Sequence, residues 1–278
     1  MKISCVIVSY NNGQLLEEAI LSVVSQTRPV DEIIVADDAS KDGSRQLIED
    51  LSHKHENIRP ILREMNLGVG PNRDLAMRDA RGDFITWLDG DDYFLPMKIE
   101  AELRAAGDRP DVIAYSDPRI RDRRTNLCEE FAIADFSRLT ASERVRWLVK
   151  RVRQSPRSML VPKKVHVAIG GYNHSLRTYE DWDYILRMAA QPLHWAHSST
   201  VGTVAHPGGG LSNQSQIEHL RDELQVLLMN RRMIRRHVGS SILVATAGRV
   251  VAVRSKWWMV ERRRRARERM KESTAHGE

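Results

Sequence analysis

The first ninety residues alternate between short apolar runs and segments with helical spacing of apolar side chains. The apolar runs are residues 3–9, 32–36, 58–62 and 84–88. Between the first two runs, Leu16, Ile20 and Val23 recur at the spacing that places them on one face of a helix. Alternating strands and helices joined by short loops favour parallel strands with right-handed crossovers. We therefore predict an α/β fold whose central sheet is mostly parallel and flanked by helices.

The remainder of the chain is predicted to extend this sheet and then to become helical. A helix is expected at residues 141–152, and a last long helix at 217–236. The charged residues 119–126 are expected to form a hairpin or a surface loop. Further strands are predicted at residues 112–116, 159–161, 193–196 and 201–205.

Three carboxylates follow the fourth apolar run, where the chain turns. Asp89, Asp91 and Asp92 come directly after the predicted strand. In open α/β sheets, ligands bind at the carboxyl ends of the strands. Carboxylates this close together repel one another unless a cation neutralises them, and their hard oxygens suit Mg²⁺ or Mn²⁺. An isolated turn of this kind is more often a solvated acidic turn, so the metal interpretation depends on the rest of the chain.

The glycine-containing turns do not match the common nucleotide-binding motifs. The turn at residues 10–13 lacks the Gly-x-Gly-x-x-Gly spacing, and Gly68 and Gly70 are not followed by the third glycine. The sequence also lacks a Walker lysine motif. A nucleotide would therefore have to bind at these strand ends through acidic and backbone groups.

Charge is distributed unevenly along the chain. The net charge is +6, but fifteen basic and six acidic residues lie from Leu220 onward, so the preceding part is slightly acidic. The basic character belongs to the C-terminal part and does not indicate a nucleic-acid groove across the protein. Only two cysteines are present, and Cys5 falls in a predicted core strand, which favours a reducing compartment. Met1 and Lys2 lead directly into a strand without a signal peptide, so we expect a cytoplasmic protein.

Five motifs, in this order and spacing, resemble family 2 glycosyltransferases, which have the GT-A fold. The resemblance runs from residue 3 to about residue 210. It implies a GT-A domain at 1–215, with a nucleotide-binding half at 1–116 and an acceptor half at 117–215, followed by a helical, basic extension at 216–278. The motifs are Val6-Ile7-Val8-Ser9-Tyr10-Asn11-Asn12, the run from Glu32 to Ser44 containing Asp37-Asp38, Asn66-Leu67-Gly68-Val69-Gly70, Leu88-Asp89-Gly90-Asp91-Asp92 and Glu180-Asp181-Trp182.

The resemblance assigns donor-binding roles to residues of the first three motifs. Val8, Ser9 and Tyr10 would lie against the nucleobase and ribose. Asp38 would accept a hydrogen bond from a ring N–H such as that of uracil, whereas Asp37 would either contact the base or brace the turn. Arg73 would either reach the nucleotide or be a solvated helix residue.

The fourth motif resembles the Asp-x-Asp metal site of the family. Asp91, helped by Asp89 or Asp92, would hold Mn²⁺ or Mg²⁺ against the donor diphosphate. Asp89 and Gly90 would also contact the donor. Gly90 suits this position because it has no Cβ and so lets the backbone approach the sugar phosphate closely. His206 precedes a glycine run and would either touch the diphosphate or metal, or have no role.

The fifth motif implies a single catalytic base, Asp181, at the start of a helix where the dipole favours its ionised form. One base without a nucleophilic carboxylate fits inversion by single displacement. The alternative is that Glu180 or Asp181 only caps the helix. Trp182 is expected to pack in the pocket wall rather than stack on an acceptor sugar.

Two features depart from the family pattern: the first concerns the contact made by the helix after Gly70, and the second concerns the expected function. Asp74 replaces an asparagine often found after the arginine, and the Gln-x-x-Arg-Trp signature of processive synthases is absent. We therefore expect a non-processive enzyme that transfers a sugar from a nucleotide diphosphate, most simply UDP, to a glycan or lipid-linked acceptor in envelope polysaccharide synthesis. A sugar nucleotidyltransferase would need a basic loop after the first strand, and residues 10–13 hold no lysine or arginine. A non-catalytic relative acting as a membrane-surface partner would have lost the acidic residues.

The C-terminal part has the composition of an interfacial anchor. Trp257 and Trp258 precede a run of basic residues from Arg262 to Lys271, which would suit aromatics at the headgroup level and cations on anionic lipid. This places the protein peripherally at the inner face of the membrane. The alternatives are a solvated or packing helix, or nucleic-acid binding, which we expect least.

Overall fold

The computed structural model describes residues 1–107, 109–122, 125–152, 154–206 and 216–240. Contacts divide the chain into two compact units, residues 1–213 and 214–278. Within the described ranges, no helix is both long enough and apolar enough to cross a membrane. The expected aromatic and basic anchor at residues 257–271 lies outside the described residues.

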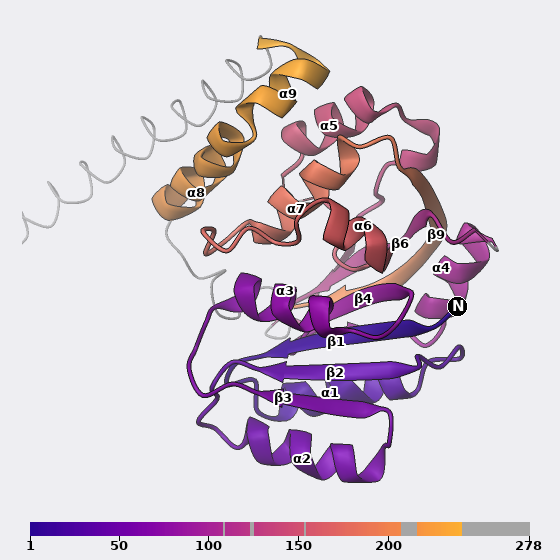
Figure 1. Ribbon diagram of the computed structural model, residues 1–278, viewed down its shortest axis with the longest axis vertical. Helices are drawn as coiled ribbons and strands as arrows, with labels where there is room; N and C mark the ends of the chain where they lie inside the picture. The colour runs from indigo at the N-terminus through magenta and orange to yellow at the C-terminus, as the bar shows by residue number, and fades with distance from the viewer. Residues whose placement is uncertain (108, 123–124, 153, 207–215, 241–278) are drawn as a thin grey trace, which may run out of the picture. The chain divides into compact units, whose positions relative to one another are not determined.

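The N-terminal half of the first unit alternates between strands and helices, as the apolar pattern predicts. Strands pair in parallel in the order β3-β2-β1-β4, so their carboxyl ends share one edge of the sheet (Figure 1). β1 and β2 are buried along their whole length, which explains why their apolar residues follow one another without polar alternation. The elements are β1 (Ile3–Ser9), α1 (Gln14–Val24), β2 (Glu32–Asp37), α2 (Ser44–Lys54), β3 (Ile58–Leu62), α3 (Val69–Asp79) and β4 (Phe84–Asp89).

The second half of this unit makes the sheet mixed. β8 is antiparallel to both β4 and β6, whereas β6 is parallel to β9. Apolar runs do not encode strand direction, so the periodicity could not reveal this arrangement. The elements are β5 (Tyr93–Phe94), α4 (Lys98–Ala106), β6 (Val112–Arg121), β7 (Cys128–Glu130), the 3-10 helix η1 (Phe136–Arg138), α5 (Ala141–Lys150), β8 (Met159–Pro162), α6 (Lys163–Ala168), α7 (Glu180–Ala189) and β9 (His194–Ala205).

Two predicted strands are one strand in the structure. The expected runs 193–196 and 201–205 belong to one strand, β9. The residues between them form an irregularity in the pairing with β6. Ser199 has a φ of +55°, and Ser198 and Thr200 join their hydroxyl groups 2.9 Å apart beside it. These polar residues hid the continuity of the strand. The predicted hairpin at 119–126 is confirmed as the β6–β7 pair.

Helices cover both faces of the sheet. Alternate residues of β1, namely Ile3, Cys5 and Ile7, join one apolar core with buried residues of α1, α2 and α4. On the opposite face, Trp87 of β4 packs edge-on against Tyr172 and Tyr184, with ring centroids 6.4 and 5.9 Å apart. The second face carries α3, α6 and α7, and therefore the helix that begins at the predicted base (Figure 1).

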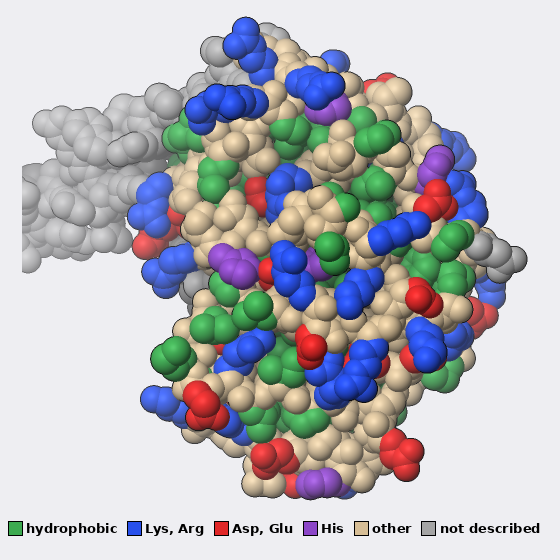
Figure 2. All heavy atoms as spheres, in the orientation of Figure 1, with side chains coloured by type: hydrophobic (Ala, Val, Ile, Leu, Met, Phe, Trp, Pro, Cys, Tyr) green, Lys and Arg blue, Asp and Glu red, His purple; other side chains and the backbone are tan. Residues whose placement is uncertain are grey.

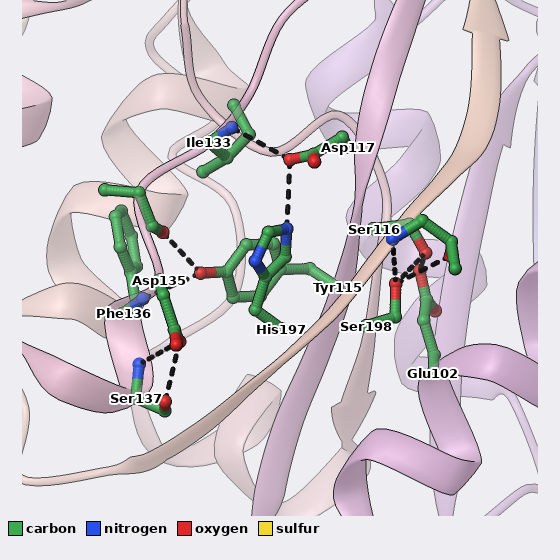
Figure 3. A network of polar contacts seen from close by, with 12 residues as sticks. Glu102, Tyr115, Ser116, Asp117, Ile133, Asp135, Phe136, Ser137, His197 and Ser198 are labelled. Carbon is green, nitrogen blue, oxygen red and sulfur yellow. Dashed lines mark hydrogen bonds and ion pairs between the residues drawn. The ribbon is translucent and has the colours of Figure 1, made fainter.

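β6 fastens a loop of the acceptor half through its side chains (Figure 3). Asp117 accepts hydrogen bonds from His197 Nε2 at 3.0 Å and from Ile133 N at 2.8 Å. Tyr115 Oη accepts from Phe136 N at 2.8 Å, and its ring stacks on that of His197. The segment before α5 is thus held on one face of this strand.

The opposite face of β6 packs against a buried ion pair of α4, formed by Lys98 and Glu102. Ser116 Oγ donates to Glu102 Oε1 at 2.8 Å (Figure 3), and Lys98 Nζ donates to Glu102 Oε2 at 2.7 Å. Both charged side chains are fully buried. Burial raises the pKa of Glu102, although the charge of Lys98 opposes the shift.

The described part of the second unit is two helices where one was predicted. α8 (Gln216–Met229) and α9 (Arg231–Val238) are separated at Asn230. The Asn230 side chain donates to Val226 O at 3.0 Å, a local bond of the kind that disfavours a continuous helix. Arg231, Arg232, Arg235 and Arg236 are exposed on α9.

Charges of both signs are intermixed on the visible surface. On the face shown in Figure 2, Lys and Arg side chains lie among Asp and Glu side chains over the described residues. Exposed ion pairs among the described residues include Arg104 with Glu100. The slightly acidic composition before Leu220 is consistent with this balance.

Candidate active site

The carboxyl ends of β1, β2 and β4 are joined by backbone hydrogen bonds. Gly90 N donates to Val8 O at 2.9 Å, and Asp38 N donates to Ser9 O at 2.8 Å. A Cβ at Gly90 would lie 2.9 Å from Val8 O and 2.9 Å from Asn12 Oδ1. The glycine is therefore needed for packing against the first turn, a reason independent of any sugar phosphate.

The first turn exposes Tyr10 and Asn11 to solvent. Tyr10 is 50% exposed, whereas Val8 and Ser9 are buried. Asn12 Oδ1 accepts from Tyr10 N at 2.9 Å and from Ser9 Oγ at 3.1 Å, which fixes the turn. Of the three residues expected at the nucleobase, Tyr10 alone has an exposed side chain, and contact of any of them with a base stays a prediction.

The two aspartates after β2 both organise loops. Asp38 accepts from Leu67 N and Gly68 N, each at 2.8 Å, and so holds the glycine-containing turn that starts α3. Asp37 Oδ1 accepts from Ser40 N at 2.9 Å, which is the bracing role considered for it. Asp37 Oδ2 is buried and finds no hydrogen-bond partner among the described residues.

The structure brings His206 to the acidic turn. His206 N donates to Asp92 Oδ1 at 2.9 Å, and His206 Nδ1 lies 2.9 Å from Asp91 O. Asp92 is buried, and its burial together with the charges of Asp89 and Asp91 raises the pKa of Asp92 well above its usual range. A cation would relieve this repulsion.

Arg73 joins the acidic turn to the start of α7. Its guanidinium is 2% exposed, donates to Glu180 Oε1 at 3.0 Å and pairs with Asp89. The expectation that Arg73 is a solvated helix residue is therefore wrong, because α3 turns this position inward. The other expectation, direct contact with the nucleotide, stays a prediction. A nucleotide would have to compete for the Arg73 guanidinium with the carboxylates of Asp89 and Glu180, which already pair with it.

Helix α7 begins from a strained residue. Tyr179 has a φ of +58°, uncommon for a residue with a side chain, and sets the direction in which Glu180 and Asp181 leave the loop. Burial, with the adjacent charge of Asp181, raises the pKa of Glu180 to about 7. Asp181 is partly exposed, so it remains accessible to a substrate. Trp182 is 1% exposed and donates to Leu148 O, so it packs against α5, and its place in a pocket wall stays a prediction.

The acidic turn fits a cation by charge but is not a preformed coordination shell. No group of three or more His, Cys, Asp or Glu side chains in the described ranges is arranged to hold a metal. Asp89 is also paired with Arg73. A metal at Asp91 would therefore require donor phosphate oxygens or water as additional ligands.

Three residues of this site were not predicted from the sequence. Asn12 fixes the first turn, and Asn72 donates to Ala36 O at 2.8 Å while accepting from Arg63 Nε at 2.9 Å. Glu180 was considered only as a cap, but it is the partner of Arg73. The available signal was position: Asn12 and Glu180 lie within recognised motifs, and Asn72 lies two residues after the third motif.

Comparison with known proteins decides the family. Residues 4–172 match the family model described as Glycosyl transferase family 2. The chain belongs to this family. An uncharacterized glycosyltransferase of Rickettsia felis is 28% identical over 235 residues, covering 81% of this chain and 37% of the relative. The chain thus spans little more than a third of the length of that relative.

Solved structures of glycosyltransferases share the GT-A fold of this family 2 member. Residues 1–349 of S. aureus TarS, solved with UDP, superpose with a TM-score of 0.64 at 18% identity, covering 85% of this chain and 70% of that fragment. The mannosyltransferase PcManGT of Pyrobaculum calidifontis, solved with GDP-Man and Mn²⁺, gives a TM-score of 0.61 at 14% identity, covering 92% and 75%. At this identity the similarity shows the fold.

Proposed function

We propose that this family 2 member is an inverting, non-processive glycosyltransferase. It moves a sugar from a nucleotide diphosphate to a hydroxyl group of a glycan or lipid-linked acceptor. The observation that carries the proposal is the buried Arg73, which ties Asp89 at the acidic turn to Glu180 beside Asp181. This link supports a donor and a base acting in one site, although the two lie on elements 90 residues apart.

In the proposed reaction, Asp181 is the general base. Its carboxylate takes the proton of the acceptor hydroxyl as that oxygen bonds to the anomeric carbon. The bond from the anomeric carbon to the diphosphate oxygen breaks, and its electron pair leaves with the nucleoside diphosphate. The Arg73–Glu180 pair keeps the helix carrying Asp181 beside the donor turn, and Trp182 anchors it to α5.

A divalent cation, Mn²⁺ or Mg²⁺, would be held by Asp91 with Asp89 or Asp92, and His206 lies at the same turn. When bound, it would neutralise the charge that develops on the leaving diphosphate. The crowding of Asp92 with two further carboxylates supports this role. PcManGT, which shares the fold, was solved with Mn²⁺.

The nucleotide is proposed to be uridine diphosphate. A carboxylate near the base suits a ring N–H donor, and Asp38 is the candidate. TarS, with the same fold, was solved with UDP, whereas PcManGT was solved with GDP-Man. The Asp38 carboxylate accepts from two backbone N–H groups, one on each oxygen, and each oxygen keeps a lone pair for a further hydrogen bond.

A supporting role for the second unit is attachment to an anionic membrane surface. The four exposed arginines of α9 would contribute to this attachment. Sedimentation with vesicles containing phosphatidylserine tests it, with a chain ending at Arg236 as the comparison. Equal binding of the full chain and the shortened chain would contradict a role for the residues beyond Arg236, and binding of neither would contradict membrane attachment altogether.

The transferase proposal is tested by a donor and acceptor screen that measures nucleoside diphosphate release. Release should need a sugar donor, an acceptor and a divalent metal. NMR of the product should show that the configuration at the anomeric carbon is inverted. A product with retained configuration would contradict the single-displacement mechanism. Failure of every UDP-sugar alongside turnover of another nucleotide sugar would contradict the uridine assignment alone.

A further inference from the structure

A second buried carboxylate stands next to Arg73 on α3 and has its own set of partners. Asp74 is 1% exposed. Its carboxylate accepts hydrogen bonds from Tyr172 N at 2.9 Å, His174 Nε2 at 2.8 Å and Arg78 Nε at 2.9 Å. His166 Nε2 lies 3.3 Å from it. Three donors converge on one side chain that the proposed mechanism does not use, and the His166 ring lies beside them.

Two of these contacts hold the loop that leads into α7. Tyr172 and His174 belong to the segment between α6 and α7, and Asp74 binds the backbone of the first and the ring of the second. Gly171 has a φ of +72°, and a Cβ there would lie 1.9 Å from Asp74 Oδ1. The loop therefore touches the carboxylate with its backbone, an approach that only glycine permits.

The loop is clamped from its other side by α7 itself. Arg187 donates to Ile169 O at 2.8 Å and to Gly171 O at 2.6 Å. On the α3 side, Arg78 donates to Gly170 O at 2.8 Å. The segment 169–172 thus connects α3 to α7 through bonds on both flanks.

Tyr172 transmits this placement to the candidate active site. Its ring stacks on Tyr184 of α7 with centroids 4.3 Å apart, and the guanidinium carbon of Arg73 lies 5.3 Å from its centroid. A shift of the Tyr172 backbone would therefore disturb both α7 and the residue that holds Asp89 and Glu180. In a close-packed interior such a shift is transmitted rather than absorbed.

We propose that Asp74 is a positioning residue that sets the start of α7, and with it Asp181, relative to the donor turn. It does so by fixing Tyr172 and His174, and it contacts neither donor nor acceptor. The inference rests on the proposed function of Asp181 as base. It predicts that Asp74 governs the catalytic step and acceptor use more than donor binding.

The test compares Asp74→Ala, Asp74→Asn and Asp79→Asn. Asp79 is the matched control, because it is on the same helix and pairs with Arg59 at 2.5 Å, away from the loop. Asp74→Ala should lower kcat by about 100-fold, the scale expected for misplaced catalytic groups. Its dissociation constant for UDP with Mn²⁺ should stay within about twofold of the wild type. Asp74→Asn keeps an acceptor for Tyr172 N and should recover part of kcat.

Hydrogen–deuterium exchange gives a readout that does not depend on activity. Residues 170–183 should exchange faster in Asp74→Ala, while peptides of β1, β2 and β4 should match the wild type and Asp79→Asn. Unchanged exchange in residues 170–183, or equal losses of UDP affinity and kcat, would overturn the positioning role. If Asp74→Ala does not fold, the same exchange and kinetic comparison is decided on Asp74→Asn. If the wild type transfers no sugar, faster exchange in 170–183 alone still supports the structural link, and the proposed function fails separately.

Discussion

Arg73 and Glu180, 107 residues apart in the chain, form a buried ion pair with Nη1 and Oε1 3.0 Å apart. The same guanidinium pairs with Asp89. One side chain on α3 therefore relates the end of β4 to the start of α7. The arrangement makes the donor turn and the helix of the candidate base parts of one electrostatic unit.

Replacing Arg73 by glutamine should destabilise the protein strongly. At pH 8, where Glu180 is ionised, removing Arg73 leaves that buried carboxylate without its counter-charge, at a cost of about 3–5 kcal/mol in the free energy of unfolding. Arg138→Gln is the control, because Arg138 is 85% exposed in its pair with Asp135 and should cost less than about 1 kcal/mol. Urea unfolding measures both. Similar small losses for the two variants would show that Arg73 is not essential to this packing.

The protonation of Glu180 should make stability depend on pH. Its pKa of about 7 in the folded state lies above the ordinary value of 4.5, so the folded state holds this proton to higher pH than the unfolded state. The contribution to stability is therefore present at low pH and is lost as pH rises from about 4.5 to about 7. The slope from this group is at most about 1.4 kcal/mol per pH unit.

Glu180→Gln isolates that contribution. The free energy of unfolding of the wild type minus that of the variant should be larger at pH 5 than at pH 8. The wild type loses stability as Glu180 releases its proton, whereas the variant has no proton to release at this position. Urea unfolding of both proteins at the two pH values gives the difference directly, and titrating groups that do not interact with Glu180 cancel. A difference that is constant or larger at pH 8 would contradict the raised pKa.

Asp181→Asn should separate binding from chemistry. Donor affinity should remain close to that of the wild type, because Asp181 acts on the acceptor. Turnover should fall by ~10²–10⁴, the usual contribution of a general base. Isothermal titration of the nucleotide and initial rates of transfer provide the two measurements. Wild-type turnover in this variant would remove Asp181 from the mechanism.

The apolar pattern predicted the parallel half of the fold, and the reasons are visible in the structure. Continuous runs such as β1 are buried on both faces, so their sequences need no alternation. β9 was split in two because Ser198, Ser199 and Thr200 interrupt its apolar pattern at an irregularity. Local sequence could not indicate that this interruption leaves the strand intact.

The site was predicted at the level of motifs but not of contacts. The family motifs identified Tyr10, Asp38 and Asp91 at strand ends that share one edge of the sheet, and His206 was considered for the glycine run that it precedes. The partnership of Arg73 with Glu180 depends on how α3 and α7 pack, which no local pattern encodes. Asp74 was noted only as a departure from the family, although its partners follow from the same packing.

The buried pair in α4 gives a test of the core away from the site. Lys98→Met should cost about 3–5 kcal/mol, because Glu102 is fully buried and would lose its counter-charge. The double variant Lys98→Met with Glu102→Leu should recover much of this loss. Arg104→Gln, on the exposed pair of the same helix, is the control. Urea unfolding that shows no recovery in the double variant would contradict the charge explanation.

The central claim is that the edge formed by β1, β2 and β4 binds a nucleotide diphosphate together with a divalent metal. Calorimetric titration of UDP, GDP, dTDP and CMP, each with and without Mn²⁺, tests it most directly, with Asp91→Asn as the variant. The account predicts that UDP binds, that binding depends on Mn²⁺, and that Asp91→Asn abolishes this dependence. Binding of none of the four nucleotides to the folded protein, or binding of UDP that is unaffected by metal and by Asp91→Asn, would contradict it.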